Sequence, residues 1–400
     1  MAAPPPPLPP TVEPASAARE QPKKSRWRRS PAAPTDAPAS SASVVQMEAP
    51  PAPLSSLASS AFSAGKDVAY TKRYEADLAR LQAREDFGHD TRWVDSHCHL
   101  ESILGRSWRG GDKPAVKEGE PVVTLDELVA SWPAGLEWCV SNCVFRRPGK
   151  PGATPEWRWI QENLHYFHSR SPLASRLWFS VGIHPHDAGN WDTEAEAFVR
   201  KLAAHEKCVG IGECGLDFFK HDKSEAEAQL RAFRAQVAIS VEMSKALVVH
   251  ARLVTAENEE LCMRTLKELV PRNHRVHIHC YSDSLQHAHE LIEHWPNLRI
   301  GFTGAITFQD PESKGKKGAG KGKVGRGTQS HCKELVQGLP LEKLLIETDG
   351  PYMCPEPFRG HTAHPGHVHR VAEKIAEWHQ RPLCDVLKAT RESARVVYGM

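Results

Sequence analysis

Short apolar runs rich in β-branched residues recur along the chain after Arg92, and segments with helical periodicity lie between most of them. This alternation is typical of repeated βα units, in which helical crossovers join the strands of a parallel sheet. The strands are predicted at residues 93–95, 137–141, 178–183, 208–212, 247–250, 276–279, 298–302 and 344–347. The helices are predicted at about residues 193–206, 223–243, 258–269, 284–295, 330–337, 366–379 and 382–397.

Eight strand signals with helical crossovers over about 310 residues predict a (β/α)8 TIM-type barrel, a fold of typically about 250 residues that accepts insertions. A doubly wound open α/β sheet is the alternative. Polar residues follow at least five of the eight runs, and the C-terminal ends of barrel strands converge on one mouth. We therefore expect a barrel whose polar residues gather at that mouth.

The N-terminal part of the chain has a different composition. Residues 1–60 are rich in proline and alanine, hold one aromatic residue, Trp27, and contain no cysteine or histidine. Such a segment buries too little apolar surface to offset its ordering entropy, so residues 1–66 are predicted to be a disordered tail. Residues 67–91 are predicted to be a lead-in segment, helical at about 70–85, and residues 92–400 to be the barrel.

Two basic stretches lie outside the predicted strands and helices. In the tail, the five Lys and Arg residues within 23–29 surround Trp27, which suits a nuclear address, a nucleic-acid contact or a solvated charge run. Residues 313–327 hold six Lys/Arg, six glycines and no acid. Barrel topology places this insert at the catalytic mouth, where it would either capture a polyanion or stay solvated.

Net charge and cysteine usage narrow the class of protein. Lys+Arg 51 and Asp+Glu 49 give a net charge of +2, which excludes a protein that acts through its overall field. No apolar run approaches the roughly 18 residues of a membrane span, and no signal-peptide pattern opens the chain. The ten cysteines are scattered singly, as reduced thiols are. We expect a nuclear or cytoplasmic protein without a membrane partner; the oligomeric state is not predicted.

Metal-binding residue types recur where the predicted strands end. The first strand runs into Asp95, His97 and His99, and the alternation of side chains along an extended chain turns all three the same way. Four later strands also end at such residues. These are Glu213, His250, His277 with His279, and Glu347 with Asp349.

Each of these residues has an ordinary structural explanation when it is taken alone. A lone histidine such as His250 is more often a satisfied core residue, and Asp349 before Gly-Pro is a common turn former. Five coincidences at strand ends favour a metal site instead. Four histidines and two carboxylates exceed the ligands of one tetrahedral zinc and suit two divalent ions that share a carboxylate. Imidazole favours Zn or Mn over Mg alone, although metal availability can override this preference.

Eight stretches of the chain, in order along about 300 residues, resemble the TatD family of metal-dependent hydrolases within the amidohydrolase-like barrels. The resemblance implies a TIM-type barrel, a binuclear metal site and nuclease activity on DNA or RNA. The matching stretches are VDSHCHL (94–100), VGIHPHDA (181–188), VGIGECGLDFF (209–219), VVHAR (248–252), HIHCYS (277–282), TGAITF (303–308), IETDGPYM (346–353) and PEPFRG (355–360).

The same resemblance implies the roles of individual residues. One ion would be held by His97, His99 and Asp349. The other would be held by His250 and His279, and Glu213 would bridge the two. His184 and His186 resemble the substrate-side histidines of the family, near the phosphate.

Chemistry supports these roles. Water bound to a divalent ion falls in pKa from about 15.7 toward 7, which provides hydroxide at neutral pH, and a second ion can stabilise the leaving oxygen of a phosphoryl displacement. Asp349 is expected to orient and deprotonate this nucleophile, with Glu213 as the second catalytic carboxylate. His184 and Arg252 are expected to hold phosphate oxygens, because the planar guanidinium of arginine can contact two at once.

Two positions raise questions about the site. The family usually has asparagine before the proline that follows the PEPFRG-like stretch, whereas this chain has His364 before Pro365, which puts the backbone capping there in doubt. His277 shares a face with His279 and could compete with it as a ligand, although packing in the barrel interior is favoured.

The sequence therefore favours a metal-dependent nuclease, of deoxyribonuclease or exonuclease type, with nucleic acid as its partner. A hydrolase of a small amide, lactone or ester is the alternative, because the barrel and the metals do not fix the substrate. A non-catalytic scaffold is disfavoured, since every expected ligand position is occupied.

Overall fold

Eight parallel strands form one sheet in the order β1 to β8, and each strand pairs with the next along the chain. The computed structural model describes residues 68–88, 91–104, 124–145, 157–168, 171, 173–219, 226–309 and 328–400. The predicted (β/α)8 barrel is confirmed, and the open sheet is excluded. The strands are β1 (Trp93–Cys98), β2 (Leu136–Phe145), β3 (Leu177–Ile183), β4 (Cys208–Asp217), β5 (Ala246–Arg252), β6 (Val276–His279), β7 (Leu298–Phe302) and β8 (Leu344–Ile346).

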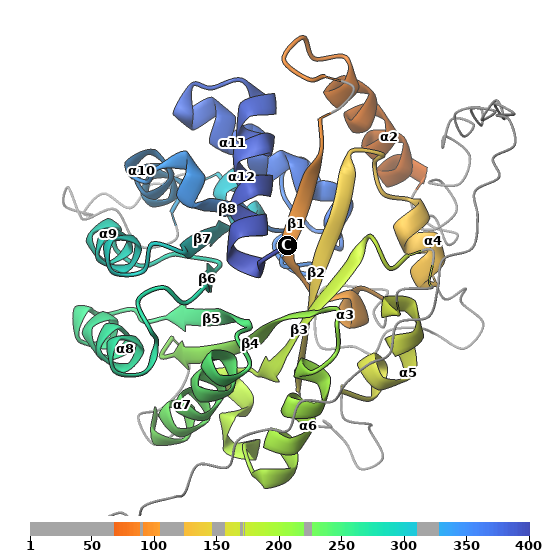
Figure 1. Ribbon diagram of the computed structural model, residues 1–400. Helices are drawn as coiled ribbons and strands as arrows, with labels where there is room; N and C mark the ends of the chain where they lie inside the picture. Colours follow the sequence, from red (N-terminus) through yellow and green to blue (C-terminus); the bar gives the residue numbers. More distant parts are fainter. Residues whose placement is uncertain are drawn as a thin grey trace, which may run out of the picture. The chain divides into compact units, whose positions relative to one another are not determined.

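Helices surround this ring of strands (Figure 1). Three short helices lie where the sequence predicted none: α3 (Leu100–Leu104), α4 (Leu125–Ala130) and α5 (Trp157–Phe167). The others are α2 (Val68–Gln82), α6 (Thr193–Ala203), α7 (Ala226–Glu242), α8 (Ala256–Leu269), α9 (Leu285–His294), α10 (Gln329–Gly338), α11 (His369–His379) and α12 (Leu383–Tyr398), with 3-10 turns η2 (Pro185–Asn190), η4 (Gly304–Thr307), η5 (Leu341–Lys343) and η6 (Pro365–His367). The predicted tail, the basic cluster at 23–29 and the insert at 313–327 lie outside the described residues.

Side-chain hydrogen bonds join the first strand to the last. The buried carboxylate of Asp95 accepts the backbone N–H of Thr348 at 2.9 Å and also its hydroxyl. The Ser96 hydroxyl donates to the carbonyl of Ile346 at 2.9 Å. The N–H of Asp349 donates to the carbonyl of His97 at 2.9 Å. The residues that follow β8 are thereby held beside the histidines of β1.

The apolar core has two layers, as in other barrels. One lies between the strands and the surrounding helices, and the other fills the barrel interior. Interior residues such as Val94, Val209 and Val248 pack against Val397 and Tyr398 at the end of α12. The C-terminus accordingly lies at the centre of the ring in Figure 1. The Tyr398 hydroxyl donates to the carbonyl of Ser96 at 2.9 Å, so the end of α12 packs into the barrel interior.

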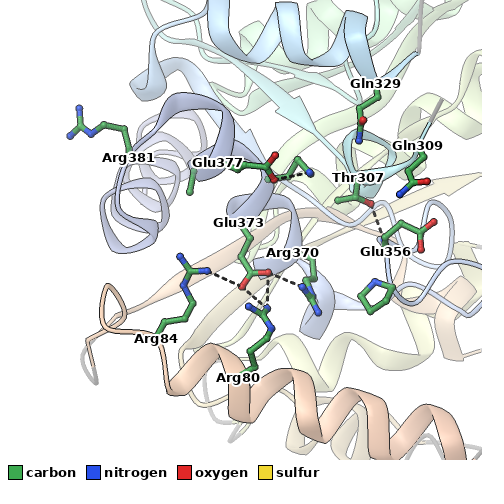
Figure 2. A pocket seen from close by; sticks show the side chains of 13 residues that line it. Arg80, Arg84, Thr307, Gln309, Gln329, Glu356, Arg370, Glu373, Glu377 and Arg381 are labelled. Atoms are coloured by element: carbon green, nitrogen blue, oxygen red, sulfur yellow. Dashed lines mark hydrogen bonds and ion pairs between the residues drawn. The ribbon is translucent and has the colours of Figure 1, made fainter.

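Helix α2 is held against α11 by a network of ion pairs (Figure 2). Glu373 accepts from Arg80 at 2.6 Å and from Arg370 at 3.0 Å, with Arg84 at 3.9 Å. The buried Asp77 of α2 accepts from His369 at 3.0 Å and also pairs with Arg370. These three arginines and Glu373 also line a pocket. Because the arginines are paired there, we assign the pocket to the contact between the two helices.

His364 caps the backbone at the start of η6, at the position where the family usually has asparagine. Its Nδ1 accepts the N–H of Gly366 at 3.2 Å, and its own N–H donates to Nδ1 of His367 at 3.3 Å. Both rings therefore carry their proton on Nε2. Each Nε2 lies 2.9 Å from the hydroxyl oxygen of Tyr70, which accepts both and thereby anchors α2.

This anchor predicts a dependence of stability on pH. Burial, with the nearby His369, lowers the pKa of His364 from 6.5 to about 3. Below pH 6.5 the unfolded chain therefore binds a proton at His364 that the folded chain does not bind. The contribution of neutral His364 to the free energy of unfolding is fully present above pH 6.5 and is lost as the pH falls toward 3, by up to about 1.4 kcal/mol per pH unit.

The prediction is tested by urea unfolding of the wild type and of His364→Asn between pH 4 and 8. Asparagine can keep the cap but does not titrate, so the variant should show a shallower loss of unfolding free energy below pH 6.5. Parallel profiles for the two proteins would show that His364 contributes nothing to the pH dependence.

Candidate metal centre and substrate pocket

The carboxylate of Glu213 lies at the centre of the histidine cluster, and the path of β4 places it there. Gly212 precedes it with φ of 131°, and a Cβ at Gly212 would lie 2.2 Å from the carbonyl oxygen of Val248 in β5. Only glycine permits this approach. Glu213 is thereby brought beside His250, which lies two residues after Val248.

One oxygen of Glu213 faces His97 of β1 and His99, which follows this strand. Glu213 Oε2 lies 2.9 Å from Nε2 of His97 and 3.6 Å from Nε2 of His99. Asp349 Oδ1 lies 3.5 Å from His97 Nε2 and 3.3 Å from His99 Nε2. Ligand atoms around a tetrahedral ion at about 2.1 Å lie roughly 3.4 Å apart, so these four side chains have the spacing of a metal site.

The other oxygen of Glu213 faces a second pair of histidines. Glu213 Oε1 lies 3.2 Å from Nδ1 of His250 and 3.1 Å from Nε2 of His184. The structure therefore brings His184, expected on the substrate side, into direct contact with the carboxylate expected to bridge the ions. One carboxylate joins two groups of three ligand-type side chains.

His279 forms a further group of ligand-type side chains with His97 and Asp349, and its ring centroid lies 5.9 Å from that of His250. Its ring stacks on that of His97, with centroids 3.7 Å apart, and its Nε2 is 4.0 Å from Asp349 Oδ1. Its Nδ1 is 3.2 Å from the buried Glu347. All six residues expected to bind metal, His97, His99, Glu213, His250, His279 and Asp349, thus lie in one cluster.

His277 contacts Glu347 and Tyr398, although with His97 and Glu347 it also forms a group that has the spacing of metal ligands. Its Nε2 lies 2.9 Å from Glu347 Oε2, and its Nδ1 lies 2.8 Å from the hydroxyl of Tyr398 in α12. His277 is thus occupied as a support for Glu347, which in turn faces His279. The geometry agrees with the expectation that His277 packs in the barrel interior.

Each imidazole that contacts Glu213 has one nitrogen near this carboxylate and one that faces away from it. The hydrogen-bond partner of the second nitrogen shows which nitrogen carries the proton of the neutral ring, and this distinguishes histidines that can bind metal from histidines that donate a hydrogen bond. His99 Nδ1 donates to the carbonyl of Asn142 at 2.9 Å, and His250 Nε2 donates to Asp217 at 3.2 Å. In the neutral form of either ring, the nitrogen without a proton therefore faces Glu213, as it does in a metal ligand. His184 differs, because its Nδ1 accepts the N–H of His186 at 3.0 Å. The proton of the neutral His184 ring is then on Nε2, which makes it a hydrogen-bond donor.

Unsatisfied buried atoms also fit a cation. Nδ1 and Nε2 of His97 and Oε2 of Glu213 are buried without a hydrogen bond, although Nε2 and Oε2 are only 2.9 Å apart. Leaving such groups unpaired is costly, and a divalent ion would satisfy the nitrogen and the oxygen that face each other. The nitrogen and oxygen donor set suits Zn or Mn.

The charge states of the cluster follow from burial and mutual contact. Burial would raise the pKa of Glu213, but the surrounding histidines hold it well below its usual range. Burial lowers the pKa of His250, yet Asp217 and Glu213 outweigh it and raise this pKa to about 9. Burial and the neighbouring His279 lower the pKa of His97 to about 4. Glu213 is thus ionised, as a metal ligand must be.

A pocket of about 800 Å³ opens over this cluster. His186 and Arg252, both expected to bind substrate, lie on its wall with His184. His186 is held by the buried Asp217 at 2.8 Å, and the guanidinium of Arg252 lies over the ring of Phe219. All the expected metal ligands except the fully buried His97 therefore share one opening with the expected substrate contacts.

Sequence reasoning assigned no role to the carboxylates behind the histidines. Asp217 holds His186 and His250, and Glu347 faces His277 and His279. Both lie inside the stretches that resemble the TatD family, at 209–219 and 346–353. Their position next to ligand residues was the available signal, but which imidazole each would contact depends on neighbouring strands.

Comparison with known proteins identifies the family to which this chain is similar. The family model of TatD related DNases matches residues 94–399. The 3'-5' RNA nuclease TATDN2 of Homo sapiens is 25% identical over 315 residues, 77% of this chain but only 35% of that protein. The Bacillus subtilis protein YabD, which is named an uncharacterized metal-dependent hydrolase, is 32% identical over 222 residues, which are 56% of this chain and 77% of YabD.

A bacterial nuclease and solved structures extend the likeness. The 3'-5' ssDNA/RNA exonuclease TatD of Escherichia coli K12 is 28% identical over 230 residues, 56% of this chain and 79% of that enzyme. The TatD homologue YjjV of Escherichia coli superposes with a TM-score of 0.56 at 21% identity, over 78% of this chain and 99% of YjjV, which supports the fold. Because the family model spans every site residue described above, this protein belongs to the TatD family of metal-dependent hydrolases.

Proposed function

We propose that this protein is a nuclease that hydrolyses phosphodiester bonds of DNA or RNA with two divalent ions, Zn, Mn or Mg. The observation that carries the proposal is the position of Glu213, whose two carboxylate oxygens face separate groups of histidines in one open pocket. Relatives named as 3'-5' ssDNA/RNA exonucleases support a single-stranded substrate degraded from its 3' end. Work on nucleic acid is consistent with a nuclear or cytoplasmic location, which stays a prediction.

In this proposal the ligands divide between the two oxygens of Glu213. His97, His99 and Asp349 would hold one ion, His250 and His279 would hold the other, and Glu213 would be shared by both. When bound, the ions supply a nucleophilic hydroxide near neutral pH and positive charge for the phosphoryl oxygens.

The remaining residues bind substrate and handle protons. Asp349 orients the attacking water and takes its proton. His184 is neutral, because burial and the neighbouring His250 lower its pKa to about 4. Its Nε2–H, which faces Glu213 Oε1 in this structure, is the donor that we assign to a phosphate oxygen of the substrate. Arg252, at the pocket wall, presents a planar fork that suits a phosphate group.

Removal of either catalytic carboxylate should abolish activity. Glu213→Ala removes the bridge, and Asp349→Asn removes the proton acceptor, so each should lower the cleavage rate by at least about a hundredfold, toward that of wild type in EDTA. Cleavage is measured on single- and double-stranded DNA and RNA with Mg, Mn or Zn. Asp385→Asn, in an exposed pair with Arg381, is the matched control and should retain full activity.

The same panel tests the alternative substrate class. Wild-type cleavage of small amides, lactones or esters without any action on oligonucleotides would replace the nuclease proposal with the alternative hydrolase. Wild-type rates for Glu213→Ala or Asp349→Asn would refute the catalytic roles of these two carboxylates.

Glu347 should control metal affinity without touching the metal. It is fully buried, faces Nδ1 of His279 and accepts the N–H of Cys280 at 2.6 Å. Glu347→Gln should weaken metal binding by about 10- to 100-fold, because the carboxylate orients the ring of its neighbour. Competition with a chromogenic chelator measures this affinity, and the exposed Glu268→Gln is the control. Equal affinities for both variants would exclude the role.

The basic insert is proposed to contribute to nucleic-acid capture. Replacing the six Lys/Arg of residues 313–327 with serine keeps the length of the segment and removes its charge. Each lost phosphate contact should reduce the slope of log affinity against log salt by about 0.7 for a single strand. Fluorescence anisotropy with a labelled oligonucleotide measures this slope, and an unchanged slope would contradict the proposal.

A further inference from the structure

Two large apolar side chains are exposed in the part of the chain that the structure describes, and both lie in the metal pocket. Phe219 is 53% exposed and Val254 is 42% exposed. Both line the opening over Glu213 and His250. Scattered exposed apolar residues are ordinary on protein surfaces, but here they coincide with the one opening where the metal ligands gather.

The backbone holds Phe219 in place although its ring is open to solvent. The N–H of Phe219 donates to Asp217 Oδ1 at 2.9 Å, and the N–H of Phe218 donates to the carbonyl of Arg252 at 3.0 Å. The guanidinium carbon of Arg252 lies 3.8 Å from the centre of the Phe219 ring. The ring is therefore positioned before any ligand arrives.

Val254 is exposed by an unusual backbone conformation. Its φ is 66°, in the left-handed region that a β-branched residue rarely adopts. The neighbouring Leu253 is fully buried, and its N–H donates to the buried Asp283 at 3.4 Å. The chain thus buries Leu253 and turns Val254 outward within two residues of Arg252.

We propose that Phe219, with Arg252 and Val254, forms a stacking platform for a nucleobase of the substrate strand. The inference rests on the proposed nuclease function and names the residues that would recognise the base. An aromatic ring stacks on any base, and an arginine beside it adds a cation–π contribution, so such a platform is tolerant of sequence. The guanidinium has no ion-pair partner among the described residues, which leaves its N–H groups for phosphate.

The platform and the metal centre share one support. Asp217 holds the N–H of Phe219 through Oδ1 and the imidazole of His250 through Oδ2 at 3.2 Å. Asp217 is itself fixed by Gln229, which accepts its N–H at 2.9 Å and donates to its carbonyl at 3.1 Å. A base stacked on Phe219 would therefore be held in a fixed relation to the phosphate at the ions. Phe219 is a positioning residue in this scheme.

The test compares oligonucleotides that carry or lack a base. Single strands are prepared intact or with one abasic site at each of the last three nucleotides from the 3' end. Wild type should lose roughly 10- to 100-fold in kcat/KM, mainly through KM, when the stacked base is missing. Phe219→Leu should cut intact and abasic strands within about twofold of each other, whereas Phe219→Trp should restore the discrimination.

A matched control comes from a second arginine–phenylalanine pair. Arg359 lies over Phe308 at 4.1 Å from the ring centre, and Phe308 is not among the residues that line the metal pocket. Phe308→Leu makes the same chemical change and should keep the wild-type discrimination between intact and abasic strands.

Binding without cleavage gives a second readout. With divalent metal withheld, 2-aminopurine placed at the position identified above should lose fluorescence on binding to wild type and to Phe219→Trp, because stacking quenches it. Binding to Phe219→Leu should leave more of the fluorescence. Because Phe219 is exposed, its substitution should not change thermal unfolding.

The outcomes separate this inference from the function on which it rests. If wild type cuts no oligonucleotide, the nuclease proposal fails. If wild type cuts oligonucleotides but shows no loss at any abasic position, or if Phe219→Leu shows the same loss as wild type, the platform is wrong and the nuclease stands.

Discussion

The carboxylate of Glu213 is buried among imidazoles at the mouth of the barrel. This burial requires the side chains around it to provide compensating positive charge. Its Oε2 lies 2.9 Å from His97 and its Oε1 lies 3.2 Å from His250, on opposite sides of one side chain. A buried carboxylate stays ionised only when positive charge compensates for the lost water. Protonated histidines can provide that charge, and divalent ions would provide it more strongly. The surrounding histidines provide such charge, and they hold the pKa of Glu213 well below its usual range despite its burial.

A second layer of acceptors lies behind the imidazoles. Asp217 stands behind His250, the carbonyl of Asn142 behind His99, and Glu347 behind His279. These partners fix which nitrogen of a neutral ring faces Glu213, so they decide whether a histidine can bind metal or donates a hydrogen bond. The layer continues through His277 to Tyr398, which connects α12 to the candidate metal centre. Asp217 extends it in the other direction to Phe219 and the proposed base platform.

Parts of the fold were predictable because their signals are local. All eight strands were found from apolar runs, and the bounds of β6 and β7 agree with the prediction. Strand β4 was predicted to end at 212 but continues to Asp217, because its hydrogen bonds persist past the polar Glu213 that ends the apolar run. Helix α4 was missed although Thr124 and Glu127 form a capping box, a signal that short-range reasoning could have used.

The sequence by itself determined which side chains arrive at the strand ends, since alternation and periodicity are properties of neighbouring residues. It also indicated the ligand types and the expected chemistry through its resemblance to one family. Only the tertiary structure decided that His184 is a donor, that His277 supports Glu347, and that Phe219 stays exposed beside Arg252. Those outcomes depend on atoms brought within about 4 Å from distant parts of the chain, and such contacts leave no periodic pattern in the sequence.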